Sequence, residues 1–208
     1  MLITKRFPNI RERRLPKILR GYSDAARAKV AEAAIRVFAE KGYSEATMDD
    51  IAKALGVTKG ALYHYYRLKV DILKEIYLQS HRSVREFFHK SLRDSDAIDG
   101  LQGLFGLATG YYKEFSPVQL EILSLATQDD KVRSIVREDY KEDLAIIEKY
   151  LQTLVKKGKI RGDVDVKFLA SSLQALSLGM LMTNLLGSGA FEDKNARKES
   201  MALLLGTR

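Results

Sequence analysis

The sequence predicts an all-α protein with about nine helices, and three observations support this class. Only three prolines occur in 208 residues, and two of them fall within the first 16. No sustained alternation of apolar and polar residues indicates a strand. Apolar residues instead recur at a spacing of three to four, which is the period of an amphipathic helix. A composition that is 46% hydrophobic supplies enough apolar side chains for a core.

The first helix is predicted over residues 24–41. Its apolar face carries Ala26, Val30, Ala33, Ala34, Val37 and Phe38. Ser23 is a residue type favoured at the N-cap, and Gly42 is a type that ends helices because glycine readily adopts positive φ. Suitable residues therefore stand at both ends of the segment.

A second and a third helix follow closely. Thr47 and Asp50 have the spacing of a capping box, which begins a helix at this point. The inward-facing side chains of that helix are Ile51, Ala52 and Leu55. Gly56 ends it in a tight turn, and Thr58 is placed to cap a short helix that runs to residue 66. Two helices joined by a short turn that contains glycine are typical of a helix-turn-helix.

The short helix has an outward face suited to nucleic acid. Leu62 and Tyr66 are four residues apart, so they share the side that packs on the core. The side that points away carries Lys59, Gly60, Tyr63 and His64. Phenol and imidazole groups donate to phosphate oxygens, and a lysine reaches guanine O6 and N7. The alternative is an ordinary short helix whose aromatic patch contacts another protein.

The net charge of +8 lies entirely in the N-terminal third. Residues 1–69 hold 15 lysines and arginines against 7 acidic residues, whereas residues 70–208 hold 20 of each. This asymmetry is typical of a polyanion-binding module attached to a neutral body. A solubilising basic tail is the alternative, because residues 1–22 carry seven cations. That segment is interpreted either as an arm that enters a minor groove or as a tail with non-specific attraction for DNA.

The remaining helices are predicted from the same periodicity. They span residues 69–92, 98–113, a segment that begins at Ser116 and Pro117, 130–157, 166–186 and 191–205. Gly158 ends the long helix before it. Residues 166–186 are apolar on almost every side, so we expect the core and a second subunit to bury them together. A monomer that keeps both of the last helices in its own core is the alternative.

Several other classes of protein are disfavoured. The chain has no cysteine, and its N-terminus lacks the apolar region of a secretory signal. The tract from Leu173 to Leu186 is too short and too polar to span a bilayer, so we expect a cytoplasmic protein without a membrane partner. His81 and His89 are eight apart with no third ligand at metal spacing, and we interpret them as surface histidines. We therefore expect no enzyme activity, no catalytic residue, no metal and no cofactor.

The segment from Ala33 to Leu73, AAIRVFAEKGYSEATMDDIAKALGVTKGALYHYYRLKVDIL, resembles the DNA-binding region of TetR-family transcriptional regulators. The resemblance implies a helix-turn-helix domain over residues 23–68 and an effector-binding and dimerisation domain over 69–208, while the basic arm over residues 1–22 precedes the usual start of the family. It also implies a homodimer that binds a palindromic operator in double-stranded DNA and represses transcription until a small effector binds.

The resemblance assigns roles to individual positions. Lys59, Gly60 and Ala61 would face bases. The DNA backbone would be contacted by Thr47, Thr58, Tyr63, His64, Tyr65 and Lys69. Leu68 and Val70 depart from the family pattern, since a small polar residue and an acidic residue are usual there. The helix that begins at residue 69 therefore lacks an obvious side-chain cap.

An effector pocket is expected among the helices after residue 69. Candidate lining residues are Phe87, Phe88, Phe105, Tyr111, Tyr112, Phe115, Tyr140 and Met180. Each of them is also compatible with plain core. No cation cluster appears inside the apolar faces, which favours a hydrophobic effector such as a fatty acid, an acyl-CoA or a drug.

A non-specific architectural DNA-binding protein is the main alternative function. Such a protein shows neither a preferred site nor a response to a ligand, whereas a ligand-responsive repressor shows both.

Overall fold

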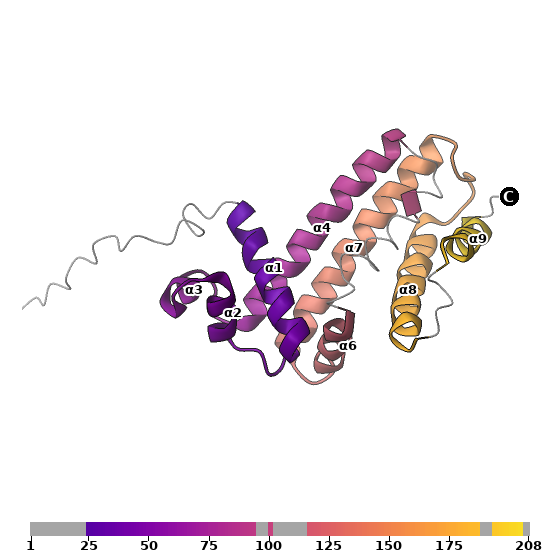
Figure 1. The fold of residues 1–208 in the computed structure, drawn as a ribbon. Helices are drawn as coiled ribbons and strands as arrows, with labels where there is room; N and C mark the ends of the chain where they lie inside the picture. Colours follow the sequence, from indigo (N-terminus) through magenta and orange to yellow (C-terminus); the bar gives the residue numbers. More distant parts are fainter. Residues whose placement is uncertain (1–23, 95–99, 102–115, 188–192, 206–208) are drawn as a thin grey trace, which may run out of the picture.

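The computed structural model describes residues 24–94, 100–101, 116–187 and 193–205. Within these ranges the chain forms eight helices and no strand, which confirms the all-α class (Figure 1). They are α1 (Asp24–Lys41), α2 (Met48–Leu55), α3 (Lys59–Tyr65), α4 (Lys69–Asp94), α6 (Ser116–Leu125), α7 (Asp130–Lys156), α8 (Val166–Leu185) and α9 (Lys194–Leu205). The expected count of about nine differs because most of the helix predicted over residues 98–113 lies outside the described residues.

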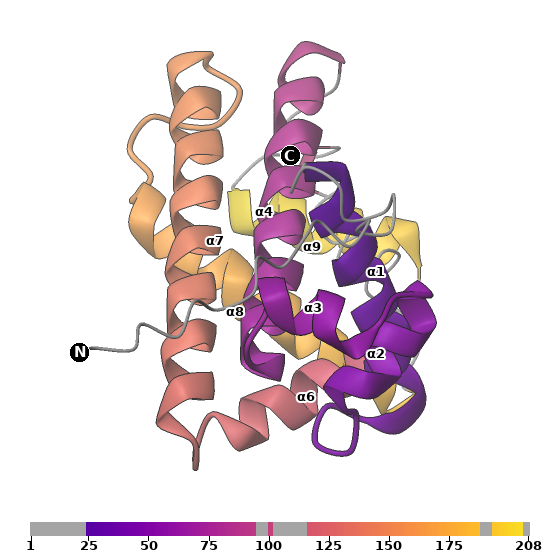
Figure 2. The same cartoon turned by 90° about the vertical axis from the view of Figure 1, so that its left-hand side faces the viewer.

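The helix-turn-helix and the last two helices lie at opposite ends of the molecule. The long helices α4 and α7 run side by side between these ends, as the two views agree (Figures 1 and 2). Helix α6 contacts both α1 and α7. The two long helices α4 and α7 therefore span the distance between the two ends.

Local capping accounts for the helix boundaries in the helix-turn-helix. Thr47 Oγ1 accepts from the Asp50 N–H at 3.1 Å, and Asp50 Oδ2 accepts from the Thr47 N–H at 3.0 Å, so the predicted capping box is confirmed. Gly56 follows α2 with a φ of 67°. Thr58 Oγ1 then caps α3 by accepting from the Ala61 N–H at 3.2 Å.

Helix α4 begins with half of a capping box. Leu68 offers no side-chain acceptor, as its sequence position indicated. Asp71, three residues on, accepts from the Leu68 N–H at 2.8 Å through Oδ2. The expectation that Leu68 supplies no side-chain cap is therefore confirmed, and Asp71 contributes only the reciprocal bond of the box.

The buried apolar side chains form two clusters. The proximal cluster joins α1, α2 and α3 to the first part of α4, to α6 and to Val132 at the start of α7. The distal cluster joins Phe88 near the end of α4 to the second half of α7, to α8 and to Leu205 of α9. The helix-turn-helix therefore shares one hydrophobic core with α4 and α6, and this core continues across residue 68.

Helix α8 leaves much of its apolar surface uncovered in a single chain. By length and composition alone this 20-residue helix could cross a membrane, and only about a fifth of it is buried inside the chain. Its buried side chains are Leu169, Ala170, Leu173 and Met180. Phe168, near the start of α8, is 73% exposed, and Leu203 on α9 is 82% exposed. These two helices thus present an apolar face to the exterior.

Two glycines of the helix-turn-helix respond oppositely to alanine. Gly56→Ala forces a Cβ into left-handed backbone and lowers the free energy of unfolding by about 1 kcal/mol. Gly60→Ala in α3 meets open space and raises it by about 0.5 kcal/mol, because alanine loses less backbone entropy. Urea unfolding of both variants measures these changes, and equal effects at the two positions would contradict this account of the turn.

Candidate nucleic-acid interface and adjoining pocket

Helix α3 presents a polar and aromatic face to the exterior. Leu62 is fully buried and Tyr66 nearly so, as the four-residue spacing predicted. Lys59, Gly60, Tyr63 and His64 are all exposed. In the view along the molecule from the helix-turn-helix end, α3 faces the viewer, with the long helices behind it (Figure 2). The side chains that could meet DNA therefore lie on one accessible face, whereas the DNA contacts themselves stay a prediction.

Three of the predicted DNA-contacting residues are placed differently from the expectation. Ala61 is only 8% exposed and belongs to the proximal cluster, so its side chain does not face outward. Tyr65 is half-buried and packs against the same cluster. Lys69 directs its ammonium group into the protein. The periodicity of a short helix did not distinguish Ala61 and Tyr65, because both pack against the same cluster as the buried Leu62.

The two threonines serve as helix caps. Thr47 Oγ1 donates to Asp50 Oδ2 at 2.7 Å as well as accepting the Asp50 N–H, so its hydroxyl proton is directed at a carboxylate. Thr58 Oγ1 accepts the Ala61 N–H, which leaves the hydroxyl proton to donate elsewhere. Both side chains are exposed. Of the two, Thr58 is chemically better prepared to donate to a phosphate oxygen.

Lys59 is held beside a carboxylate of the preceding helix. Its Nζ lies 2.8 Å from Asp49 Oδ1, and the hydrogen bond to Asp49 raises the pKa of Lys59. Nζ also lies 5.6 Å from the centre of the Tyr63 ring. Both charged side chains are more than half exposed, so solvent screens the pair strongly. The pair orients Lys59 without preventing a nucleic acid from displacing Asp49.

Lys69, the first residue of α4, fastens the α1–α2 loop (residues 42–46). Its Nζ donates to the carbonyl oxygens of Tyr43, Ser44 (2.8 Å) and Ala46 (2.7 Å). An ammonium group has three protons, so these three acceptors use all of them. Burial lowers the pKa of Lys69. In this structure Lys69 therefore binds the protein's own backbone just before the Thr47 cap, and its contact with the DNA backbone stays a prediction.

Glu121 of α6 holds the same loop from the other side. Its two carboxylate oxygens accept from the N–H groups of Tyr43 and Ser44, each at 2.7 Å. Burial opposes ionisation of Glu121, but the hydrogen bonds from Ser44 and Tyr43 outweigh it and lower its pKa. Sequence reasoning missed this residue. The available signal was that Glu121 is the only charge in the otherwise apolar α6.

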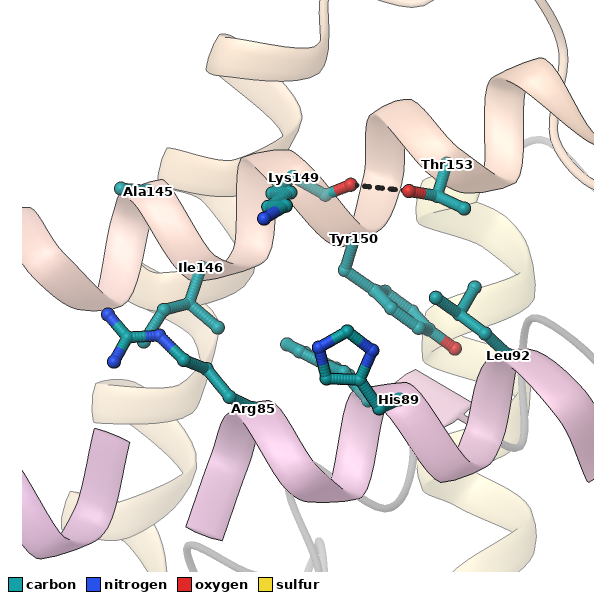
Figure 3. Close-up of a pocket in the computed structure, with 9 residues that line it drawn as sticks. Arg85, His89, Leu92, Ala145, Ile146, Lys149, Tyr150 and Thr153 are labelled. Atoms are coloured by element: carbon teal, nitrogen blue, oxygen red, sulfur yellow. Dashed lines mark hydrogen bonds between the residues drawn. The ribbon is translucent and has the colours of Figure 1, made fainter. Parts of the chain in front are cut away.

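A cavity of about 250 Å³ lies between α4 and α7 (Figure 3). It is lined by Arg85, Phe88, His89 and Leu92 of α4 and by Ala145, Ile146, Lys149, Tyr150 and Thr153 of α7. The rings of Phe88 and Tyr150 stack at 4.0 Å between centroids and form an aromatic wall. The cavity is thus apolar inside, with three basic side chains from facing helices around it.

The cavity agrees only in part with the predicted effector residues. Phe88 lines it, whereas Phe87 is half-buried and Met180 lies in the distal core. Tyr140 is 44% exposed and lies on α7 outside the cavity. Four further candidates, Phe105, Tyr111, Tyr112 and Phe115, lie outside the described residues. Arg85, His89 and Lys149 lie around the cavity as exposed side chains from two helices, so they do not place a cation cluster inside the apolar faces.

His81 is buried, contrary to its interpretation as a surface histidine. It is 4% exposed, and its Nε2 lies 2.8 Å from Asp139 Oδ1 and 3.4 Å from Asp143 Oδ1, both on α7. Burial alone would lower the pKa of His81, but the two carboxylates raise it to about 9. His89, eight residues on, is exposed as predicted. The sequence could not reveal the cluster because its three members come from helices nearly 60 residues apart.

Known protein families match both the N-terminal and the C-terminal part of the chain. Residues 25–76 match the model of bacterial regulatory proteins of the tetR family, and residues 108–206 match that of the C-terminal part of BetI-type transcriptional repressors. The uncharacterised HTH-type transcriptional regulator YfiR of Bacillus subtilis is 22% identical over 203 residues, which is 92% of this chain and 96% of that protein.

Solved structures share the fold. The transcriptional regulator FadR from Bacillus subtilis in complex with stearoyl-CoA has a TM-score of 0.68 and 21% identity, over 87% of this chain and 98% of that one. A transcriptional regulator from Saccharomonospora viridis in complex with choline has a TM-score of 0.65 and 24% identity, over 88% and 97%. At such identities the likeness concerns the arrangement of helices.

Glu121→Gln weakens the hold on the α1–α2 loop. One of the two backbone N–H groups then faces the amide NH₂, which cannot accept its hydrogen bond. The other N–H bonds to a neutral oxygen in place of a charged one, so the free energy of unfolding falls by about 1–3 kcal/mol. Because the pKa of Glu121 is lowered in the folded protein, this stabilisation is present above the usual glutamate pKa of 4.5 and is lost as the pH falls through the folded value. Urea unfolding at several pH values measures the difference.

Glu138→Gln is the matched control, since it removes only an exposed partner of Lys74 at 3.5 Å. Such a surface pair contributes about 0–1 kcal/mol. Equal losses in the two variants would contradict the special role given to Glu121.

Proposed function

Because this chain belongs to the TetR family of transcriptional regulators, we propose that it is a cytoplasmic repressor that binds a palindromic operator as a homodimer until a small effector releases it. The observation that carries this proposal is the face of α3. Lys59, Tyr63 and His64 stand exposed on the second helix of a helix-turn-helix, and the helix is fixed from behind by Leu62 and Tyr66. In this motif the second helix enters the major groove.

The apolar face of α8 and α9 supports a dimer. Large apolar side chains on these helices, such as Phe168 and Leu203, are mostly exposed in one chain. Burying them against the same face of a second copy removes that area from water and gives a closed two-fold assembly. The two copies of α3, at the opposite end of each chain, would then meet successive major grooves about 34–36 Å apart.

The basic arm adds affinity without reading sequence. Residues 1–22 carry seven lysines and arginines, and phosphate contacts of this kind release counterions. On this proposal residues 23–68 form the DNA-binding domain and residues 69–208 bind effector and the second subunit. The relatives are DNA-binding regulators, which supports binding rather than catalysis as the activity of this chain.

The cavity between α4 and α7 favours an amphiphilic acid as effector. Phe88 and Tyr150 supply an apolar wall, and Lys149 supplies positive charge at its edge, where Arg85 is paired with Glu142. A volume of about 250 Å³ is slightly below the roughly 300–1,000 Å³ of most ligand pockets, which favours a small effector such as a medium-chain fatty acid. The FadR complex with stearoyl-CoA supports an acyl effector, whereas the basic edge disfavours a cation such as the choline of the other neighbour.

Helix α4 provides the link from effector to operator. It lines the cavity at Phe88 and begins at Lys69, whose ammonium group holds the α1–α2 loop. A shift of α4 on ligand binding therefore displaces the loop and the Thr47 cap of α2 that follows it. A coupling free energy of about 1–3 kcal/mol between the two sites suffices for regulation.

Selection of binding sites from random duplex DNA at near-physiological salt tests the proposal. A palindromic consensus supports a dimeric, sequence-reading regulator. Retention of DNA without any consensus, lost steeply as salt rises, contradicts it and favours the architectural alternative. The selected consensus then serves as the operator in the following experiments.

Lys59 and Tyr63 are expected to contribute differently to operator binding. Lys59→Ala relaxes base preference at one position of each half-site, because the lysine reaches a base edge. Tyr63→Phe weakens binding to operator and random DNA alike, because its hydroxyl donates only to the backbone. Site selection and titration with both kinds of DNA check this. An unchanged consensus for Lys59→Ala would exclude base reading by this residue.

Decanoic acid is expected to release the protein from the operator. The Lys149→Gln variant should require about tenfold more decanoic acid for release, since a charged contact of about 1.4 kcal/mol is lost. Lys141→Gln, an exposed lysine of the same helix outside the cavity, is the control. Fluorescence anisotropy of labelled operator measures release. Release by choline with no effect of decanoic acid would overturn the acidic-effector assignment.

A further inference from the structure

We propose that His81, Asp139 and Asp143 form a binding site for a divalent transition-metal ion between α4 and α7. The three side chains offer one imidazole nitrogen and two carboxylate oxygens, all within 4.8 Å of one another. Asp139 and Asp143 are four residues apart on one face of α7, and His81 faces them from α4. This site goes beyond the proposed repressor function and does not depend on it.

The spacing of the donor atoms already suits a small metal ion. His81 Nε2 lies 2.8 Å from Asp139 Oδ1 and 3.4 Å from Asp143 Oδ1. Ligands about 2.1 Å from a metal such as zinc stand about 3.0–3.4 Å apart in octahedral or tetrahedral geometry. Small side-chain rotations therefore bring the three donors onto one ion without a change in the backbone.

The histidine is buried in a way that calls for a partner at Nε2. It is 96% buried, and neither of its ring nitrogens makes an aligned hydrogen bond within the described part of the chain. The 2.8 Å approach to Asp139 has the length of a hydrogen bond without its direction. Burial opposes protonation of His81, but the two carboxylates outweigh it and raise the pKa of His81. A metal ion would therefore first have to displace the proton from Nε2 and would then take the nitrogen lone pair.

Charge balance also favours a dication. Two carboxylates face one imidazole, and the nearby arginines on α4 are committed elsewhere: Arg82 pairs with Asp24, and Arg85 pairs with Glu142. A divalent ion that displaces the imidazole proton would neutralise both carboxylates, whereas the imidazolium neutralises only one. In addition, Gln174 of α8 donates to Asp143 Oδ2 at 3.2 Å, which orients that ligand from outside as metal sites commonly require.

The donor set indicates the class of metal. Imidazole with carboxylates suits Zn²⁺, Mn²⁺, Fe²⁺, Co²⁺ and Ni²⁺, with water in the remaining positions. Calcium requires six to eight oxygen ligands, and magnesium is held mainly through water and carboxylates, so both fit less well. The chain has no cysteine to compete for the ion.

The position of the site gives it a structural consequence. It lies on α4 between Tyr77 of the proximal cluster and Phe88 of the distal cluster, where the apolar packing of α4 on α7 is interrupted. An ion here would bridge α4 and α7 one to two turns from Arg85 and Ile146 of the cavity. Metal binding would therefore fix the two helices against each other at the boundary of the two cores.

Metal titration of the tag-free, chelator-treated full-length protein tests the site. Calorimetry with Zn²⁺ and absorption spectra with Co²⁺ should show one saturable site per chain, with Mg²⁺ and Ca²⁺ much weaker. His81→Gln and Asp143→Asn should each weaken binding at least about tenfold, since even outer partners of a metal contribute that much. His89→Gln, the exposed histidine on the same helix, should bind like the unaltered protein.

Proton NMR of the imidazoles in the unaltered protein provides a readout that does not depend on folding of the variants. Zinc should shift the signals of His81 and leave those of His64 and His89 in place. Absence of saturable binding, binding retained in both His81→Gln and Asp143→Asn, or a shift confined to His64 or His89 would each overturn the proposal.

Discussion

The position of the helix-turn-helix depends on how the α1–α2 loop is held. Lys69 and Glu121 come from two different helices and bind the carbonyl and N–H groups of the loop. All three ammonium protons of Lys69 donate to loop carbonyls. The loop is short and runs directly into the Thr47 capping box, so fixing it fixes the start of α2 and, through the Gly56 turn, the direction of α3. Five backbone groups of one loop thereby connect the exposed face of α3 to α4 and α6.

The two hydrophobic clusters explain how a movement could travel between the ends of the molecule. Helices α4 and α7 belong to both clusters, and between the two cores their contact is polar at His81, Asp139 and Asp143. Apolar cores resist deformation because they are closely packed, whereas a polar boundary rearranges at less cost. The polar contact at His81 lies on α4 between the cavity and Lys69. It would therefore determine how far a shift of α4 at the cavity is transmitted to Lys69.

Local patterns predicted the described helices and the caps of α2 and α3, because those features depend on neighbours in sequence. The Thr47 capping box, the Gly56 turn and the long helix from Asp130 to Lys156 follow from spacing alone. Features made by contact between distant helices were not predictable: Glu121 on the loop, the basic edge of the cavity, and the carboxylates beside His81. Lys69 was given a DNA contact because its position resembles the family pattern, and a resemblance does not show where a long side chain turns.

Amide hydrogen exchange at Tyr43 and Ser44 tests the central claim most directly, because their N–H groups are the ones that Glu121 holds. The protein would be measured free, bound to operator, and with an effector that releases the operator. Both amides are expected to exchange slowly in the first two states and markedly faster with effector. Unchanged protection at both amides while the operator is fully released would contradict control through this loop.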